Sequence, residues 1–248
     1  MNLTSPDYNF SEILLSKKDI EKKLVLPKKI DEKLAYEIGT SLGDGCIPTR
    51  AKSYRLKGNI NDEQEYYKNI IKPLFKELYN IDIKLRDYGS AYGFEIYSKT
   101  LVNFKNKIIG LPIGPKKECF IPNWIKTSKK SILCSLLSGL FDTDGSIYFR
   151  SQGKKKKYYP VLTYNTISSN LAKDIQEILK TLGFKVNIYK TIRNTKRTPN
   201  NLYFVRLYGY ENFFRFLKMI ETKQPKNIDK INIWKEDWPN LANMAGMV

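Results

Sequence analysis

Residues 137–145 read Leu-Ser-Gly-Leu-Phe-Asp-Thr-Asp-Gly, an apolar run that carries small residues and ends in acids and a glycine. Residues 37–45 form a looser copy, Glu-Ile-Gly-Thr-Ser-Leu-Gly-Asp-Gly, which begins one hundred residues earlier in the chain. This offset pairs Asp44 with Asp144 and Gly45 with Gly145. The rest of the chain reads as two half-proteins, each organised around one copy.

Small residues recur every four positions in both copies, a spacing that lines one face of a helix. They are Ala35, Gly39 and Gly43 in the first copy and Ser135, Gly139 and Thr143 in the second. A face of small side chains lets two helix backbones approach closely, as is best known from membrane helices. Chance can produce one such face, but two in matched register favour a pair of helices packed along them.

An acid followed by glycine ends each predicted helix, and glycine is common just past a helix end. If the helices pair along their small faces, Asp44 and Asp144 meet at one end. Two carboxylates about 5 Å apart repel by roughly 3 kcal/mol at an effective dielectric constant of about 20. A divalent metal ion would offset this repulsion, since hard cations prefer oxygen ligands, here the carboxylates and the neighbouring carbonyls of Gly43 and Thr143. Bridged to phosphate, such a site would resemble two-metal phosphodiester chemistry.

The second copy, LSGLFDTDG, resembles the nine-residue motif of the LAGLIDADG homing endonucleases, and IGTSLGDG in the first copy resembles a degenerate form. The first copy departs from the pattern, with Leu42 in place of the earlier Asp and Glu37-Ile38 in place of Leu-Ala. The resemblance covers about residues 31–228 as an internal repeat. It implies that the last acid of each motif, Asp44 and Asp144, is a metal ligand of a catalytic site.

Each half is predicted to contain a helix, two strands, a helix, two strands and a helix. The first half has helices over 31–43, from 62 onward with a kink or split at Pro73, and over 101–109, with strands over 46–50, 54–60, 81–88 and 92–97. The second half has helices over 132–142, 168–182 and 211–219, with strands over 146–150, 158–167, 184–189 and 202–208. This order fits an α+β fold with helices on one face of an antiparallel sheet. The resemblance implies two pseudo-symmetric αββαββα halves with saddle-shaped sheets, joined at the paired helices.

Five parts are predicted along the chain. They are an N-terminal accessory segment over 1–30, the first half over 31–109, a linker rich in Pro and Lys over 110–130, the second half over 131–228 and a tail over 229–248. A helix is expected over 11–24 of the accessory segment. Trp234 and Trp238 are expected to pack the tail onto the body.

The composition favours a nucleic-acid partner. The 248 residues include 43 basic and 25 acidic side chains and no histidine, a formal net charge of +18. Such an excess is typical of proteins that bind nucleic acid or an anionic membrane surface, but no apolar run is long enough to cross a membrane. The lack of histidine excludes hydrolase triads and nucleases that use a histidine base. Cys46, Cys119 and Cys134 make no CxxC pair, which argues against zinc and suits a reducing, intracellular location, either an archaeal cytoplasm or an organelle.

The outward face of the predicted strands is polar and basic. A two-stranded ribbon fits the DNA major groove, where Lys and Arg suit phosphates and guanine edges, and Asn and Gln suit adenine edges. The candidate DNA contacts are Arg50, Arg55, Lys57, Asn59, Lys84, Arg86, Arg150, Gln152, Lys154, Lys185, Asn187, Tyr189, Arg193, Arg206 and Tyr208. A solvated basic surface is the alternative for any one of them. The resemblance implies two sheets seated on DNA and cleavage across the minor groove that leaves short 3′ overhangs.

Two lysines follow the two halves in similar contexts, Lys116 after Gly114-Pro115 and Lys226 after Gln224-Pro225. In the family resembled here, a basic residue after the third helix of a half, or on a nearby strand, helps to organise water and to stabilise transition-state charge. Lys116 and Lys226 are therefore candidate catalytic residues, with Lys117 as the alternative to Lys116. A solvated linker lysine is the other interpretation. In the absence of histidine, a metal ion would activate the attacking water.

The leading hypothesis is a monomeric, intron-encoded homing endonuclease that cuts double-stranded DNA at a specific site. Mg²⁺ is the expected cofactor, with Mn²⁺ able to replace it and Ca²⁺ able to bind without supporting cleavage. Neither a membrane nor an obligate protein partner is expected. The alternatives are an RNA maturase that acts on intron RNA, a non-catalytic nucleic-acid binder, and a structural basic protein of a ribonucleoprotein. Retention of both acids disfavours the non-catalytic alternatives.

Overall fold

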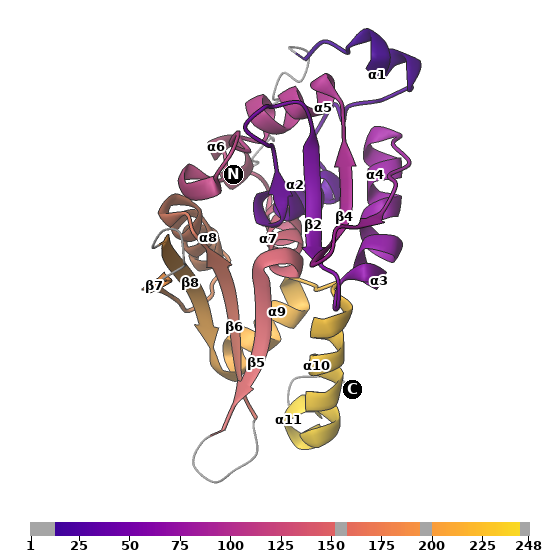
Figure 1. The fold of residues 1–248 in the computed structure, drawn as a ribbon. Helices are drawn as coiled ribbons and strands as arrows, with labels where there is room; N and C mark the ends of the chain where they lie inside the picture. Colours follow the sequence, from indigo (N-terminus) through magenta and orange to yellow (C-terminus); the bar gives the residue numbers. More distant parts are fainter. Residues whose placement is uncertain (1–12, 152–157, 194–199, 244–248) are drawn as a thin grey trace.

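Two halves of similar design meet at two central helices in the computed structural model, which describes residues 13–151, 158–193 and 200–243 (Figure 1). The central helices are α2 (Glu32–Gly43) and α7 (Lys130–Asp144). Each is followed by two strands, a helix, two strands and a helix, so the predicted α+β order is confirmed in both halves.

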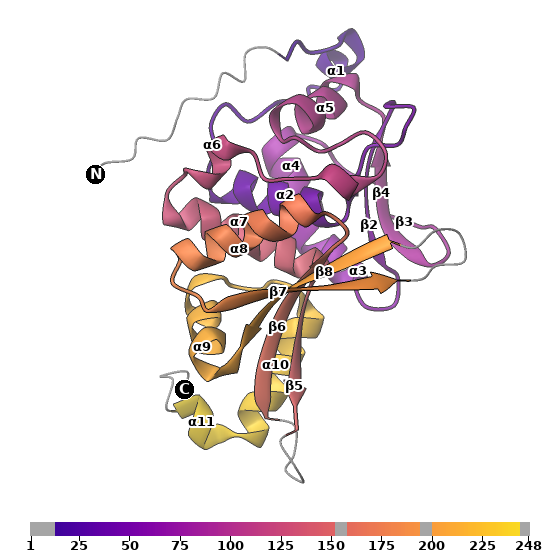
Figure 2. The same ribbon diagram turned by 90° about the vertical axis from the view of Figure 1, so that its left-hand side faces the viewer.

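The sheets of the two halves share one topology but differ in size. The first half contains β1 (Gly45–Cys46), β2 (Tyr54–Asn59), α3 (Gln64–Tyr66), a π-helical turn (Tyr67–Ile71), α4 (Lys72–Tyr79), β3 (Arg86–Asp87), β4 (Ala91–Ile96), α5 (Lys99–Asn103) and a second π-helical turn (Phe104–Ile108). The second half contains β5 (Gly145–Arg150), β6 (Tyr159–Thr166), α8 (Ser169–Thr181), β7 (Val186–Arg193), β8 (Asn200–Tyr208) and α9 (Gly209–Met219). Both sheets are antiparallel, in the orders β1-β2-β4-β3 and β5-β6-β8-β7. The sheet of the first half and the β7–β8 ribbon come to the same side of the molecule (Figure 2).

Local sequence signals explain where the helices begin and end. The side chains of Asp31, Ser98 and Ser168 accept hydrogen bonds from main-chain N–H groups in the first turns of α2, α5 and α8, as N-cap residues do. Asn80 ends α4 in the left-handed conformation, with φ of 54°. Pro73 lies in the first turn of α4, directly after the π-helical turn. The helical conformation continues from Gln64 to Tyr79, so the helix is not split, and the hydrogen-bond pattern changes locally before Pro73 instead.

Both central helices contribute to continuous cores beneath the sheets. In the first half, Phe75 of α4 packs edge-to-face on Phe94 of β4 with ring centroids 4.8 Å apart. In the second half, Phe141 of α7 contacts Phe216 of α9 at 4.6 Å. Phe94 and the other buried strand residues alternate with the polar positions of the strands, so the opposite sheet faces remain available to a ligand.

Glycines allow α2 and α7 to touch backbone to backbone. A Cβ atom added at Gly39 would lie 2.1 Å from the carbonyl oxygen of Leu136, and one added at Gly139 would lie 2.0 Å from that of Tyr36. Real side chains do not approach so closely, so both positions require glycine. Ala35 is fully buried, whereas Ser135 is partly exposed.

A buried ion pair fixes α2 against the rest of the first half. The Lys105 amine and the Glu37 carboxylate form a salt bridge in which both side chains are fully buried. The same amine donates to Tyr79 Oη at 3.0 Å and Ser41 Oγ at 3.1 Å, and burial lowers the pKa of Lys105. Because each polar atom of the pair has further partners, the desolvation of the two charges is compensated.

Segments outside the halves pack onto them. They include α1 (Lys17–Glu21), a 3₁₀ turn (Lys116–Glu118), α6 (Asn123–Lys126), α10 (Pro225–Asp237) and α11 (Pro239–Asn243). Trp234 of α10 stacks on Phe149 at 5.6 Å, and Trp238 contacts Tyr158 at 5.3 Å, as expected from the sequence. Figure 1 shows α10 starting beside α3 of the first half and then running alongside β5. It runs through the expected boundary at residue 228, so Lys226 and Trp234 lie on one helix.

Three predicted elements are shorter in the structure. Residues 11 and 12 of the helix expected over 11–24 lie outside the described residues, and over 13–24 the helix is only α1, which begins after the N-cap Ser16 and ends before Lys23 at φ of 55°. The strand expected over 46–50 ends at Cys46, because a turn closes through Ala51 N–H and the Pro48 carbonyl. The strand expected over 81–88 is only β3. Its earlier residues keep the alternating burial, and Ile83 is buried, but alternation reports a half-buried face and does not require a paired strand.

Substituting Gly39 with alanine should lower the free energy of unfolding by about 3 kcal/mol or more, because the new methyl group meets main-chain atoms that cannot move independently. Alanine would otherwise stabilise a helix relative to glycine by about 1 kcal/mol. Urea denaturation of Gly39→Ala and of the exposed helical control Asn69→Ala measures the difference. Equal stability of the two variants would contradict the backbone contact.

Replacing Lys105 with methionine should cost about 3–5 kcal/mol of unfolding free energy, since it leaves the Glu37 carboxylate buried without its counter-charge. Lys107→Met, an exposed position on the same π-helical turn, is the matched control. Chemical denaturation of both variants tests this, and a loss no greater than that of the control would argue against a compensated buried pair.

Candidate active site at the end of the paired helices

The ends of α2 and α7 lie against each other and bring the two motif acids together. A Cβ atom added at Gly43 would lie 1.9 Å from Thr143 Oγ1 and 3.6 Å from Asp144 Oδ2. The Thr143 hydroxyl donates back to the carbonyls of Gly139 and Leu140. Asp44 and Asp144 follow these residues at the helix ends, and both are half-buried. Close packing of the helices therefore places two carboxylates in one partly desolvated site.

The electrostatics of this site disfavour two bare carboxylates. Burial raises the pKa of Asp44 well above its ordinary value, and the charges of Asp144 and Glu63 raise it further. Burial also raises the pKa of Asp144, with Glu63 acting in the same direction. Carboxylates that repel one another in a desolvated site retain a proton or attract a cation.

Both candidate lysines lie at this cluster. The Lys116 amine donates to the carbonyl oxygen of Leu42 at 3.1 Å, and its charge lowers the pKa of both Asp44 and Asp144. The Lys226 amine pairs with Glu63, and its charge lowers the pKa of Asp44. Lys117 is exposed on the 3₁₀ turn that also holds Lys116. The structure thus brings Lys116 and Lys226, from segments 110 positions apart in number, to one acid pair.

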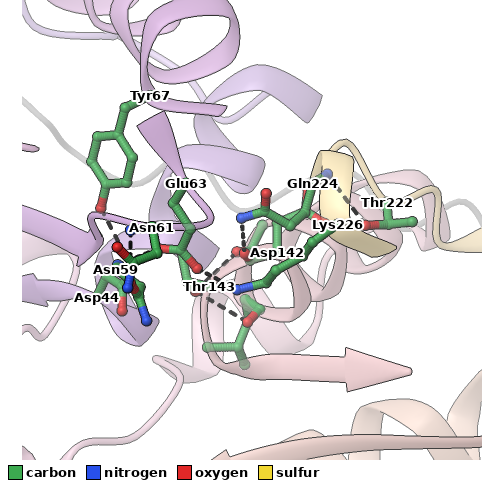
Figure 3. Close-up of polar contacts among 12 residues, drawn as sticks. Asp44, Asn59, Asn61, Glu63, Tyr67, Asp142, Thr143, Thr222, Gln224 and Lys226 are labelled. Carbon is green, nitrogen blue, oxygen red and sulfur yellow. Dashed lines mark hydrogen bonds and ion pairs between the residues drawn. The ribbon is translucent and has the colours of Figure 1, made fainter. Parts of the chain in front are cut away.

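Two further side chains enter the cluster from the first half (Figure 3). Glu63, at the start of α3, has a side chain that is 5% exposed and accepts a hydrogen bond from the Asn59 N–H at 2.8 Å. Tyr67 Oη donates to Asp44 Oδ2 at 3.4 Å. In Figure 3, Glu63 and Lys226 meet in the space between the purple first half and the pink strand and helix of the second half.

Asp142 anchors the loop between α9 and α10 to the motif helix. Its carboxylate accepts hydrogen bonds from Tyr36 Oη at 2.6 Å, Thr222 Oγ1 at 2.5 Å and Lys223 N–H at 2.9 Å. The Gln224 side-chain amide donates to the Asp142 carbonyl at 3.1 Å. Burial raises the pKa of Asp142 to about 6, although these donors act in the opposite direction. This network holds residues 222–224 next to Lys226.

The acid pair suits an open metal site rather than a closed one. Within the described parts of the chain, no three Asp, Glu, Cys or His side chains converge as ligands of one ion. Asp44 and Asp144 offer carboxylate oxygens, which are the donor type that Mg²⁺, Mn²⁺ and Ca²⁺ prefer. An ion held by these two carboxylates would keep positions free for main-chain carbonyls, water and phosphate.

The predicted contacts of the first half occupy the open face of its sheet, but several already have partners. Arg55 pairs with the facing Glu95 at 2.9 Å, and Lys57 lies over the Tyr88 ring at 3.2 Å. Asn59 and Arg86 are exposed at the ends of β2 and β3. Arg50 and Lys84 are exposed as well, although both lie outside the strands on which they were expected.

The second sheet carries a more continuous basic and aromatic face. The Arg150 guanidinium lies over the rings of Tyr148 and Tyr208, at 5.6 and 5.5 Å. The Arg206 guanidinium lies over Tyr189 and Phe204, at 5.3 and 4.8 Å. These rings fix the arginines on the face opposite to the helices.

The remaining predicted contacts of the second half differ in setting. Asn187 faces Arg206 across the β7–β8 ladder and is exposed. Lys185 lies before β7 and forms a salt bridge with Glu211 of α9 at 2.8 Å, so its amine is engaged with an acid. Gln152, Lys154 and the side chain of Arg193 lie outside the described residues.

Glu63, Tyr67 and the anchoring role of Asp142 were not predicted from the sequence. Tyr67 lies within the helix predicted from residue 62 onward, where its ring suits packing, and Glu63 lies in the polar run at the start of that helix. The signal for Asp142 was available, since its counterpart in the first copy is Leu42. A buried carboxylate at only one of two repeated positions indicates that hydrogen-bond donors surround that position in one copy of the repeat and not in the other.

Residues 131–221 match the family model of the LAGLIDADG-like domain. The second half of the chain is a LAGLIDADG-like domain. Its structure and that of the first half together form the two-domain LAGLIDADG architecture, so the resemblance predicted from the two motifs is confirmed.

Solved structures of the same architecture include I-DmoI, a homing endonuclease, in complex with DNA and Ca. That structure has a TM-score of 0.54 and 16% identity, over 81% of this chain and 97% of that one. Full-length DUF199/WhiA from Thermotoga maritima has a TM-score of 0.51 and 14% identity, over 90% of this chain and 66% of that one. At these identities the likeness establishes the fold, and a fold can host several functions.

Curated relatives match over most of this chain but little of their own. The glutamine–fructose-6-phosphate aminotransferase of Methanocaldococcus jannaschii is 26% identical over 207 residues, 83% of this chain and 18% of the relative. The replicative DNA helicase DnaB of a Synechocystis species is 28% identical over 223 residues, 83% of this chain and 24% of the relative. Since proteins with unrelated names share the matching segment, neither named activity transfers to this chain. No helix in the described ranges is long and apolar enough to span a bilayer.

Replacing Asp142 with leucine, the residue at the matching position of the first copy, should lower the unfolding free energy by about 3 kcal/mol, because Thr222, Tyr36 and the Lys223 N–H lose their acceptor. The amide hydrogen of Lys223 should also exchange faster with solvent. Hydrogen exchange and urea denaturation measure both effects, with Asp142→Asn as a control that keeps one side-chain oxygen. Wild-type stability and exchange in Asp142→Leu would contradict the anchor.

Proposed function

We propose that this protein is a divalent-metal-dependent endonuclease that cuts double-stranded DNA at one long site and leaves short 3′ overhangs. The observation that carries the proposal is the meeting of Asp44 and Asp144 at the end of the glycine-packed helices, with Lys116 and Lys226 acting on them electrostatically. A bound ion would supply Lewis-acid stabilisation of the scissile phosphate and lower the pKa of a water molecule.

The residues of the chain have separate roles in this proposal. Asp44 and Asp144 would hold the ion through their carboxylate oxygens, and its charge would offset the repulsion between the two acids. Lys116 and Lys226 supply positive charge near the phosphate, where charge develops in the transition state. Lys116 has its amine held at the Leu42 carbonyl, and Lys226 has its amine held at Glu63, so both are pre-positioned in the free protein.

DNA is the proposed substrate because both sheets carry basic side chains opposite the helices, and the first sheet and the β7–β8 ribbon come to the same side of the molecule (Figure 2). The charge of +18 supplies sequence-independent attraction to phosphates. The arginines and polar side chains on the strands would enter the major groove and contact base edges. Recorded LAGLIDADG structures of I-DmoI contain DNA with Ca or Mn, which supports this class of ligand and cofactor.

A binding protein without nuclease activity is the second candidate. It is favoured by the occurrence of the same fold in DUF199/WhiA. An RNA maturase that acts on intron RNA would use the same basic faces. Retention of both acids, each desolvated and each opposed by a nearby lysine charge, favours the endonuclease. We further propose that the enzyme acts as an intracellular monomer in a reducing compartment, which its three free cysteines suit.

Replacing either motif acid with asparagine should abolish cleavage and leave DNA affinity nearly unchanged, because the substitution removes a negative charge from the metal site and nothing from the sheet faces. The loss of cleavage rate should be about 10³-fold or more, as for removal of a principal electrostatic group. Rates of Asp44→Asn and Asp144→Asn are measured under single-turnover conditions, and affinity is measured by gel shift with Ca²⁺.

Asp62→Asn, an exposed acid close to the cluster in sequence, is the matched control and should cut at the wild-type rate. Wild-type cleavage by Asp44→Asn or Asp144→Asn would overturn the assignment of the metal site. Equal losses of binding and cleavage would instead indicate a folding defect, which circular dichroism of the same samples detects.

A further inference from the structure

The lysine-bearing segment that follows each half contacts both halves, and two kinds of contact point recur in the two segments. At the first point, the carbonyl ending a motif helix accepts a side-chain hydrogen bond at 3.1 Å, from Lys116 to Leu42 and from Gln224 to Asp142. At the second point, the segment reaches the start of a helix in the opposite half. Ser168 before α8 donates to the Cys119 carbonyl at 2.6 Å, and Glu63 before α3 accepts from the Lys226 amine.

Since the two segments contact the same kinds of position, the differences between their hydrogen bonds show how each lysine is held. In the first segment the Lys116 amine is held at the motif helix of its own half, while the opposite half holds other groups of the segment, through Ser168 and Asp174. In the second segment a glutamine takes the motif-helix position, and the lysine amine is held by a carboxylate of the opposite half. The Lys116 amine is therefore held by its own half, whereas the Lys226 amine is held by the opposite half.

The Glu63 carboxylate lies in a space beside Gly58 of β2, which is called its seat below. A Cβ atom added at Gly58 would lie only 1.7 Å from Glu63 Oε2, so the carboxylate occupies space that a side chain on β2 would fill. Glu63 Oε2 accepts from the Asn59 N–H, while Oε1 accepts from Lys226 Nζ at 2.5 Å. Both oxygens are used, and the side chain is nearly fully buried. Rotation of Glu63 away from this seat would cost both bonds.

We propose that Glu63 is a positioning residue that holds the Lys226 amine beside Asp44, and that this tie makes the two halves of the site unequal in catalysis. The inference rests on the proposed endonuclease function for its catalytic part, whereas the positioning part concerns the free protein. Glu63 holds the Lys226 amine, whereas the Lys116 amine is held by the Leu42 carbonyl and does not depend on Glu63. Loss of the Glu63 tie therefore slows cleavage of the DNA strand whose phosphate depends on Lys226, and spares the other strand.

The positioning part is tested without DNA by reductive methylation of lysines with formaldehyde, followed by mass spectrometry. Glu63→Gln keeps the size of the side chain and the bond from Asn59 but removes the charge that holds Lys226. The methylation rate of Lys226 should rise by about tenfold, the size of effect expected when a charge-assisted hydrogen bond is lost. Lys116 should react at the wild-type rate.

A second variant and a control keep this test independent of any folding defect. Gly58→Ala displaces the Glu63 carboxylate by contact and should reproduce the rise at Lys226. Glu65→Gln, an exposed acid on the same turn, should leave it unchanged. Melting temperatures of all variants are measured alongside. An unchanged Lys226 rate in both Glu63→Gln and Gly58→Ala would overturn the positioning role.

The catalytic part is tested by following each DNA strand separately on a cleaved target. Glu63→Gln and Lys226→Met should slow the same strand and accumulate nicked duplex, and the double variant should be no slower than Lys226→Met alone, because the two residues act as one unit. Equal slowing of both strands, or wild-type rates on both, would overturn the inequality. If the wild-type protein cuts nothing, the proposed function fails, while the methylation result still decides the role of Glu63.

Discussion

The close approach of α2 and α7 is the constraint on which the rest of the structure depends. Gly39 and Gly139 let the two backbones touch, and Gly43 lets the helix ends converge beside Thr143. Any side chain at these positions would separate the helices, and with them the carboxylates of Asp44 and Asp144. The same contact joins the halves, so the position of one sheet relative to the other and the position of the acid pair are set together.

The structure departs from two-fold symmetry both on the sheets and around the acid pair. The longest strand of the first sheet has six residues, while β8 of the second has nine. Arg55 of the first sheet is paired with an acid, whereas Arg150 and Arg206 of the second are framed by aromatic rings, which keep a guanidinium in place at little entropic cost. At the centre, Asp142 and Glu63 each have a role in one half only. In a single chain with two diverged halves, an acid in one half can anchor a loop while an acid in the other half holds a lysine. Two identical halves could not differ in this way.

Much of this organisation was predictable, because it depends on residue spacing that tertiary contacts reinforce. The stripe of small residues predicted the helix pair, and the repeat predicted the order of elements and the meeting of Asp44 with Asp144. The positions of Lys116 and Lys226 followed from the Pro-Lys repeat. The seat of Glu63 could not be predicted, because it depends on the space left by Gly58 and on the return of α10 to the first half. The short β3 could not be predicted either, since alternation gives burial and not strand pairing.

Metal-dependent cleavage of a specific DNA site by the acid pair can be measured with a large randomised duplex library. The protein is incubated with the library in Mg²⁺, Ca²⁺ or EDTA, and the cut ends are sequenced. The account predicts one long site cut with Mg²⁺ only, with short 3′ overhangs. Cutting that persists in EDTA, or no cutting of a sufficiently diverse library by protein that binds RNA tightly, would contradict it.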